Sequence, residues 1–244
     1  MSIKDTLKSI QSKIESAQKR GGFSHPVQLI AVTKTHPFSL IKECSDAGIT
    51  AIGENRIQEA SKKFASFDSM PDLSRRFIGH LQSNKVNKCL ELFDTIDSVD
   101  SVKLLIKISN AALQWKRTVP VLLEINTSGE TQKHGFLPDQ LDEISECFNI
   151  PNINIEGLMT VGPLTIDKEK IRNSFIQLRE LKETMNQPGL NELSMGMSGD
   201  YEIAVEEGST MVRLGTALFG VRNIFLKPYF KGSSQGITKS NKRR

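Results

Sequence analysis

The sequence predicts an α/β fold, a single (β/α)8 TIM barrel with one extra helix at its N-terminus. Short apolar segments of β character alternate with amphipathic helical segments in about eight consecutive units, the pattern of a parallel barrel. No segment of linker composition interrupts residues 1–226, and this length suits one barrel. A doubly wound open sheet is the alternative, but the first strand is not followed by the glycine-rich turn typical of that fold.

The extra helix is the first predicted element. Apolar residues recur at spacings of three and four from Ile3 to Ala17, with Ser2 placed to cap the start and Gly21-Gly22 placed to end it. The eight strands are predicted at residues 27–33, 51–53, 76–79, 95–98, 119–125, 153–159, 192–195 and 211–214. The helices that follow them are predicted at residues 38–46, 56–67, 85–92, 101–115, 138–148, 167–185 and 201–207 and from residue 216 onward.

Three of these helices have specific predicted starts. Ser83 or Asn84 is expected to cap the helix at 85–92, and Asp100 the helix that follows it. Pro138 is expected to occupy the first turn of its helix, where a missing N–H group costs nothing.

The composition is that of a soluble protein, with 38% hydrophobic and 25% charged residues. No apolar run approaches the roughly 20 residues of a membrane helix, and the first residues lack the apolar core of a signal peptide. Cys44, Cys89 and Cys147 have no CxxC spacing, so we expect buried free thiols and no metal site. We therefore expect a cytoplasmic protein without a membrane partner.

Charge is distributed unevenly along the chain. The formal net charge is +4, but residues 227–244 hold six basic residues and no acidic one. The other 226 residues hold 26 basic and 28 acidic residues, a net charge of −2, which argues against a nucleic-acid partner. We expect two regions, a barrel domain at 1–226 and a disordered basic tail rich in Gly, Ser and Lys at 227–244.

Lys34 ends the first predicted strand. Pro37 biases His36 away from helical backbone, so the strand should stop near Lys34. The ammonium would then lie at the carboxyl end of a buried strand, where barrel enzymes place their chemistry. Apolar neighbours there would remove its hydration and make it a better amine nucleophile. The alternative is a lysine that merely marks where a strand meets water.

Two loops near the C-terminus have the composition of an anion-binding cup. Gly196, Ser198 and Gly199 precede one predicted helix, and Gly215-Thr216 precede another. Small residues let backbone N–H groups approach an anion, and barrel enzymes commonly bind phosphate at the loops after strands seven and eight. Simple turn chemistry is the alternative for each loop alone.

Lys34, this cup and Arg213 together suit pyridoxal 5'-phosphate (PLP). This cofactor needs an amine for its aldehyde, a cup for its phosphate and a partner for its ring nitrogen. A guanidinium only donates hydrogen bonds, so Arg213 would keep the ring nitrogen neutral and disfavour transaminase-like chemistry. A salt bridge in the barrel wall is the alternative role for Arg213.

Six motifs, in order and at the right spacing, resemble the pyridoxal phosphate homeostasis proteins, the YggS/PROSC family. The motifs are Ala31-Val32-Thr33-Lys34, Gly53-Glu54-Asn55-Arg56-Ile57-Gln58-Glu59, Phe77-Ile78-Gly79-His80-Leu81-Gln82-Ser83-Asn84-Lys85, Gly157-Leu158-Met159-Thr160, Leu193-Ser194-Met195-Gly196-Met197-Ser198 and Val212-Arg213-Leu214-Gly215-Thr216. The resemblance covers about residues 1–222 and departs from the family pattern at Arg76, where the family usually has histidine. It says nothing of the 24 residues after Phe219-Gly220.

The resemblance implies a fold-type III PLP-binding barrel like the N-terminal domain of alanine racemase. It implies that Lys34 forms a reversible aldimine, that Ser198, Gly215 and Thr216 hold the phosphate, that Arg213 meets the ring nitrogen and that Asn55 lines the ring side. The implied role is buffering PLP and delivering it to apo PLP-dependent enzymes, in vitamin B6 and amino-acid homeostasis, without established catalytic turnover.

A PLP-dependent amino-acid racemase is the rival function. Two-base racemisation needs a second acid/base opposite the lysine, and the racemases that this chain resembles take it from a tyrosine of a second domain across a dimer. The tyrosines here are Tyr201 and Tyr229, and the chain leaves no residues for such a domain. We therefore expect a monomeric carrier. An inert barrel that only binds partners would leave Lys34, the cup and Arg213 without a purpose.

Overall fold

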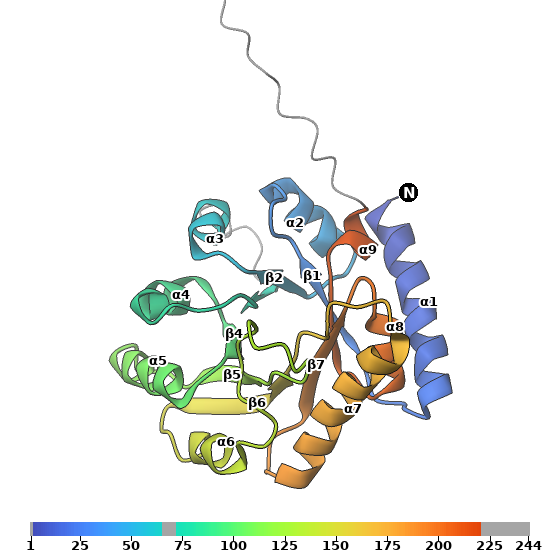
Figure 1. Cartoon of the computed structure of the whole chain (residues 1–244). Coiled ribbons are helices and arrows are strands. Elements are labelled where there is room, and N and C mark those ends of the chain that lie inside the picture. Colours follow the sequence, from blue (N-terminus) through green and yellow to red (C-terminus); the bar gives the residue numbers. More distant parts are fainter. Residues whose placement is uncertain (1, 65–71, 221–244) are drawn as a thin grey trace, which may run out of the picture.

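Eight parallel strands close into a barrel, which confirms the predicted fold class (Figure 1). The structure is a computed structural model and describes residues 2–64 and 72–220. Each strand pairs with the next in the chain, and β1 pairs with β8 to close the barrel. The strands are β1 (Gln28–Val32), β2 (Ala51–Glu54), β3 (Ser74–Phe77), β4 (Thr95–Val99), β5 (Val119–Glu124), β6 (Ile153–Met159), β7 (Glu192–Met197) and β8 (Met211–Leu214).

Helices surround the strands as an outer ring (Figure 1). They are α1 (Ile3–Gly21), α2 (Phe38–Asp46), α3 (Ile57–Phe64), the 3₁₀ turn η2 (Ser83–Lys85), α4 (Val86–Leu92), α5 (Val102–Gln114), α6 (Leu141–Cys147), α7 (Lys168–Met185), α8 (Tyr201–Glu206) and α9 (Thr216–Phe219). In the part of the chain that the structure describes, no helix has the length and apolar character needed to span a bilayer. The predicted domain boundary at 226 and the tail at 227–244 lie outside the described residues.

The apolar core has two parts. The larger fills the space between the strands and the helices, and it includes the buried free thiols of Cys44, Cys89 and Cys147, as predicted. Burial raises the pKa of Cys44 and of Cys147 to about 12, so both stay protonated near neutral pH. The smaller part lies inside the barrel, and five strands contribute to it: Ile30, Ala51, Leu122, Met159 and Met211.

The extra helix α1 lies outside α8 and α9 (Figure 1). Ser2 and Asp5 form a reciprocal capping box at its start, and Gly22 ends it with left-handed backbone at φ 76°. A Cβ atom on Gly21 would lie only 2.2 Å from the carbonyl oxygen of Glu206, so only glycine allows this close contact with α8. The predicted helix and both of its boundaries are confirmed.

The third strand lies two residues earlier than predicted, at Ser74–Phe77 rather than at 76–79. The prediction began at Arg76, so it left out Ser74 and Arg75 and included Ile78 and Gly79, which follow the strand. Inside the barrel, the Arg76 guanidinium pairs with Asp97 through contacts of 2.8 and 3.0 Å. Burial alone lowers the pKa of Arg76, but Asp97 raises it above its ordinary value. A charged side chain can therefore lie within this strand because its partner lies within the next.

Three predicted helix starts are wrong. Helix α4 follows a 3₁₀ turn and has Lys85 at its N-cap, without a side-chain hydrogen bond from Ser83 or Asn84. Helix α5 is capped by Ser101, whose Oγ accepts from an N–H of the first turn, rather than by the preceding aspartate. Helix α6 begins at Leu141, because the chain at Pro138 first forms a separate turn.

Candidate functional site

One pocket of about 440 Å³ at the carboxyl end of the barrel contains all six residues that the sequence predicted as a site. They line it together with small and apolar neighbours, and the whole lining comes from the ends of six strands, β1, β2, β3, β6, β7 and β8, and the loops that follow them. The lining residues are Val32, Lys34, Asn55, Ile78, Gly79, Val161, Met197, Ser198, Gly199, Arg213, Gly215 and Thr216.

Strand alternation explains why these side chains meet. Ile30 and Met211 point into the barrel with the inner apolar cluster, and side chains two and four residues further along the strand direction share that side. Lys34 is four residues beyond Ile30, and Arg213 is two residues beyond Met211. Asn55 is four residues beyond Ala51, which is also a residue of the inner apolar cluster. The inner cluster therefore forms the floor, and these polar groups stand above it.

The turn that carries Lys34 has unusual backbone. Thr35 has φ 67°, a left-handed conformation that is rare for a β-branched residue. Two contacts hold it there, since Glu59 of α3 accepts from the Thr35 N–H group and the His36 N–H group donates to Thr33 O at 3.0 Å. Strained backbone of this kind persists only where its surroundings enforce it. The turn leaves the Lys34 side chain half-buried at the pocket wall.

A buried ion pair supports this turn from the outer side of the barrel. Lys63 Nζ of α3 lies 2.5 Å from Glu54 Oε1 and donates to the carbonyl oxygen of Thr33 at 2.9 Å. Burial raises the pKa of Glu54, while Lys63 and Thr33 act to lower it. The sequence analysis assigned no role to Glu54, Glu59 or Lys63. The four-residue spacing of Glu59 and Lys63 within a predicted helix indicates an ion pair between these two residues, but it does not indicate their contacts with the turn.

Arg213 is held rigidly within the barrel. Its Nη1 donates to the Ser194 carbonyl (2.7 Å) and hydroxyl (2.8 Å), and its Nη2 donates to the Thr160 carbonyl at 2.7 Å. Three of its five N–H groups are used by these contacts, so two can face a ligand. Burial lowers the pKa of Arg213, and the carboxylates of Asp97, Glu124 and Asp200 oppose that shift.

The two predicted anion-binding loops are joined by one hydroxyl group. Ser198 Oγ, after β7, accepts from the backbone N–H groups of Gly215 (3.2 Å) and Ala217 (3.0 Å), after β8. Thr216 begins α9, so its own N–H group has no partner within that helix. Asp200 fixes the first loop, since its Oδ1 accepts from Met197 N at 2.6 Å. Hydroxyl and amide groups thus gather at one end of the pocket.

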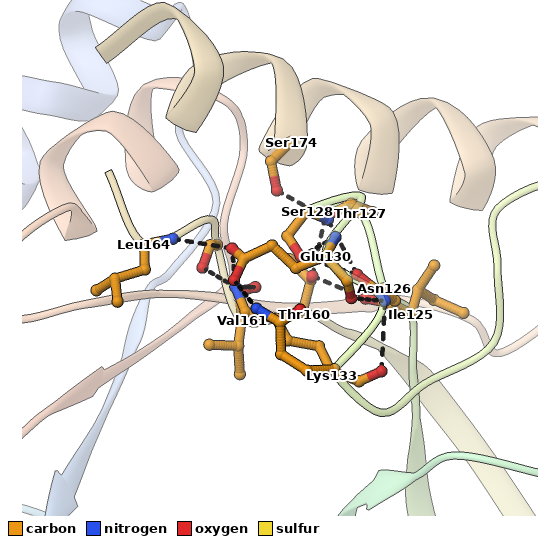
Figure 2. Close-up of polar contacts among 12 residues, drawn as sticks. Ile125, Asn126, Thr127, Ser128, Glu130, Lys133, Thr160, Val161, Leu164 and Ser174 are labelled. Carbon is orange, nitrogen blue, oxygen red and sulfur yellow. Dashed lines mark hydrogen bonds and ion pairs between the residues drawn. The ribbon is translucent and has the colours of Figure 1, made fainter. Parts of the chain in front are cut away.

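The loop after β6, which contributes Val161 to the pocket, is linked to the loop after β5 (Figure 2). Lys133 Nζ pairs with Glu130 Oε1 at 2.9 Å and donates to the carbonyl oxygen of Gly162 at 2.8 Å. Glu130 Oε1 also accepts from Leu164 N at 3.1 Å. These contacts fix the segment that includes Val161, a residue of the pocket wall.

The residues present fit PLP. The pocket is of a size that takes small ligands. It offers an amine at Lys34, hydroxyl groups at Ser198 and Thr216 beside the small residue Gly215, the amide group of Thr216, and an arginine with unused donors. Asn55 completes one wall. His80, also on the rim, does not line this pocket but an adjacent hollow of about 250 Å³ that shares Asn55 with it.

Comparison with known proteins first defines the class. The sequence profile described as "Alanine racemase, N-terminal domain" matches residues 6–223. The barrel superposes on alanine racemase of Clostridium difficile with a TM-score of 0.72 at 18% identity, covering 90% of this chain and 57% of that one. The fold is therefore the PLP-binding barrel class typified by that domain.

Relatives at higher identity are more specific. A pyridoxal phosphate homeostasis protein of Vibrio cholerae is 40% identical over 229 residues, 91% of this chain and 97% of its own length. The human protein of that name is 36% identical over 91% of this chain and 87% of its own. The structure of PipY from Synechococcus elongatus with PLP bound matches with a TM-score of 0.78 and 37% identity, covering 90% of this chain and all of that one. The chain belongs to the pyridoxal phosphate homeostasis protein family.

Proposed function

We propose that this protein binds PLP in the Lys34 pocket, holds it through a reversible Schiff base with Lys34 Nζ, and thereby buffers and delivers it. PLP supplies an aldehyde that a lysine amine attacks reversibly. The observation that carries the proposal is that one pocket is lined by all six predicted residues, Lys34, Asn55, Ser198, Arg213, Gly215 and Thr216. The relatives named for pyridoxal phosphate homeostasis and the PLP-bound PipY structure support it.

Each side chain has a distinct part in this proposal. Ser198, Gly215 and Thr216 hold the phosphate: the Ser198 and Thr216 hydroxyl groups and the Thr216 amide group donate to it, and Gly215, whose N–H group donates to Ser198 Oγ, lets it approach the backbone. Arg213 faces the ring nitrogen, and Asn55 lines the side of the ring. Because the Ser194 and Thr160 carbonyls fix the guanidinium, Arg213 orients a ligand without rearranging first. Recipients of the cofactor would be apo PLP-dependent enzymes in the cytoplasm, served by a monomeric carrier.

A carrier suits the pocket better than a racemase does. Racemisation needs a second acid/base on the far side of the cofactor. Tyr201 is buried at the start of α8 and lines a different hollow, between α1 and α7. Burial also raises the pKa of Tyr201, which makes it a poor base near neutral pH. Tyr229 lies outside the described residues.

A transfer assay tests this function. Full-length protein is loaded with PLP, separated from free cofactor by gel filtration and mixed with an apo PLP-dependent enzyme. We expect the enzyme to regain activity in proportion to the PLP supplied, and the loaded protein to interconvert alanine enantiomers no faster than free PLP. Failure to retain PLP through gel filtration would contradict binding. Racemisation well above the rate with free PLP would favour the alternative, a PLP-dependent amino-acid racemase.

A further inference from the structure

Three metal-ligating side chains converge on the barrel rim outside the Lys34 pocket. His80 follows β3, Asp100 follows β4, and His134 lies in the loop after β5. The two Nδ1 atoms are 3.1 Å and 3.8 Å from the same atom, Asp100 Oδ2, and ligand atoms of all three residues lie within 4.8 Å of one another. We propose that His80, Asp100 and His134 bind one divalent transition-metal ion, with Zn²⁺ as the probe.

The donor set defines the class of ion. Two imidazole nitrogens and one carboxylate oxygen suit Zn²⁺ and similar divalent ions such as Co²⁺ and Ni²⁺. Ca²⁺ and Mg²⁺ prefer sites built from oxygen ligands alone. Three protein ligands leave a fourth position of a tetrahedral ion open to water or to a small ligand.

The carboxylate at the centre of the cluster is already oriented. Ser101 Oγ donates to Asp100 Oδ1 at 3.0 Å, which leaves Oδ2 directed at the two histidines. The Asp100 side chain is only 13% exposed, so water competes little for it. A hydrogen bond to the second oxygen of a ligating carboxylate is a common support of metal sites.

The histidine rings stack, with centroids 3.8 Å apart and planes 13° from parallel. A divalent metal ion binds the neutral form of an imidazole ring, through a ring nitrogen lone pair. Parallel rings direct their lone pairs side by side rather than at one point. Binding therefore requires one ring to turn, and His134, 55% exposed, is free of the packing that would prevent it. The proposal thus predicts that the metal separates the rings.

Zinc titration of the untagged full-length chain by calorimetry tests the site. We expect one ion per chain. His134→Gln and Asp100→Asn should each lower the association constant by more than about tenfold, since loss of a supporting group alone costs about 10- to 100-fold. His36→Gln, a rim histidine outside the cluster, is the matched control and should bind as the unaltered chain does. Circular dichroism checks that the variants are folded; His134 is exposed enough for its replacement to be tolerated.

Two spectroscopic measurements show where the ion lies. Co²⁺ should give visible d–d bands without a thiolate charge-transfer band, because the three cysteines are buried elsewhere. The imidazole NMR signals of His80 and His134 should shift together when Zn²⁺ is added. The proposal is overturned by absence of saturable 1:1 binding, by equal affinity in His134→Gln, or by a thiolate band that assigns the ion to cysteine.

Discussion

At the scale of single residues, Arg213 is the most constrained group of the site. It is buried within the barrel, and its hydrogen bonds join the ends of β6, β7 and β8. Three carboxylates, Asp97, Glu124 and Asp200, oppose the loss of its charge. It therefore both stabilises the rim and, in our proposal, sets the charge of the cofactor ring.

Replacement of Arg213 tests the second role. Arg213→Glu would offer a carboxylate to the ring nitrogen, so we expect an altered visible spectrum and a loss of PLP affinity of roughly tenfold or more, as for a lost charged hydrogen bond. Because this variant also adds a carboxylate near three others, Arg213→Gln is the companion that keeps a donor without the charge. Equilibrium dialysis and absorption spectra measure both. An unchanged spectrum and affinity in two folded variants would remove Arg213 from the proposed site.

Single residues also show what the sequence could predict. Lys34, Ser198 and Gly215 stand in short motifs after strands, and the rule that strand ends share one rim is enough to bring them together. The support of the site was not predictable in this way. The contact of Glu59 with the Thr35 amide joins residues 24 apart, and Arg76 is explained only by Asp97 on the next strand. The first pair depends on how α3 packs beside the turn after β1, and the second on the register of β3 against β4; no local sequence pattern contains either.

At the scale of elements, α1 is attached to the barrel by charge as well as by apolar packing. Arg20 of α1 donates to Glu206 Oε1 at 2.6 Å, and Arg172 of α7 donates to Glu206 Oε2 at 2.5 Å. Burial alone would raise the pKa of Glu206, but the hydrogen bonds from Arg172 and Arg20 bring it below its ordinary value. One carboxylate thus joins three helices.

This lowered pKa gives a pH dependence of stability. A carboxyl group whose pKa is lower in the folded state stabilises the fold above its unfolded pKa, and the contribution disappears as the pH falls through the folded value. Glu206→Gln should therefore lower the free energy of unfolding by about 1 kcal/mol at pH 7, and the difference should shrink toward pH 4. Urea unfolding at both pH values measures it.

Glu202→Gln is the matched control for that series. Its carboxylate is 41% exposed and lies 3.5 Å from Arg20, so we expect an effect below about 0.5 kcal/mol. A Glu206→Gln difference that stays constant from pH 7 to pH 4 would contradict the role given to its charge.

The elements that the sequence predicted best have strong local signals. Ser2 as cap, the Gly21-Gly22 pair and apolar residues at spacings of three and four gave the boundaries of α1, and the predicted bounds of β6 are also those observed. The start of α6 was missed, because a proline early in a helical pattern suits a preceding turn as well as a first helical turn. The cap of α5 was missed because Asp100 and Ser101 are both good capping residues, and Asp100 instead faces the histidines.

At the scale of the whole molecule, closure of the barrel produces the functional rim. Parallel strands joined in order bring loops from all parts of the chain to one end. The Lys34 pocket uses the ends of β1, β2, β3, β6, β7 and β8, and the proposed metal site uses the loops after β3, β4 and β5, so the loop after β3 contributes to both. The metal site was not predictable from cysteine and histidine spacing, since its three ligands are 20 and 34 residues apart.

The most direct test of the central claim is the site of covalent attachment. The purified full-length protein is incubated with PLP, reduced with borohydride, digested and mapped by mass spectrometry, with Lys34→Ala treated in parallel. We expect a yellow protein that loses its visible band on reduction, one phosphopyridoxyl group on Lys34, and neither band nor label in folded Lys34→Ala. A label on another lysine, or an unchanged visible band in Lys34→Ala, would contradict the assignment of Lys34 as the residue that holds the cofactor.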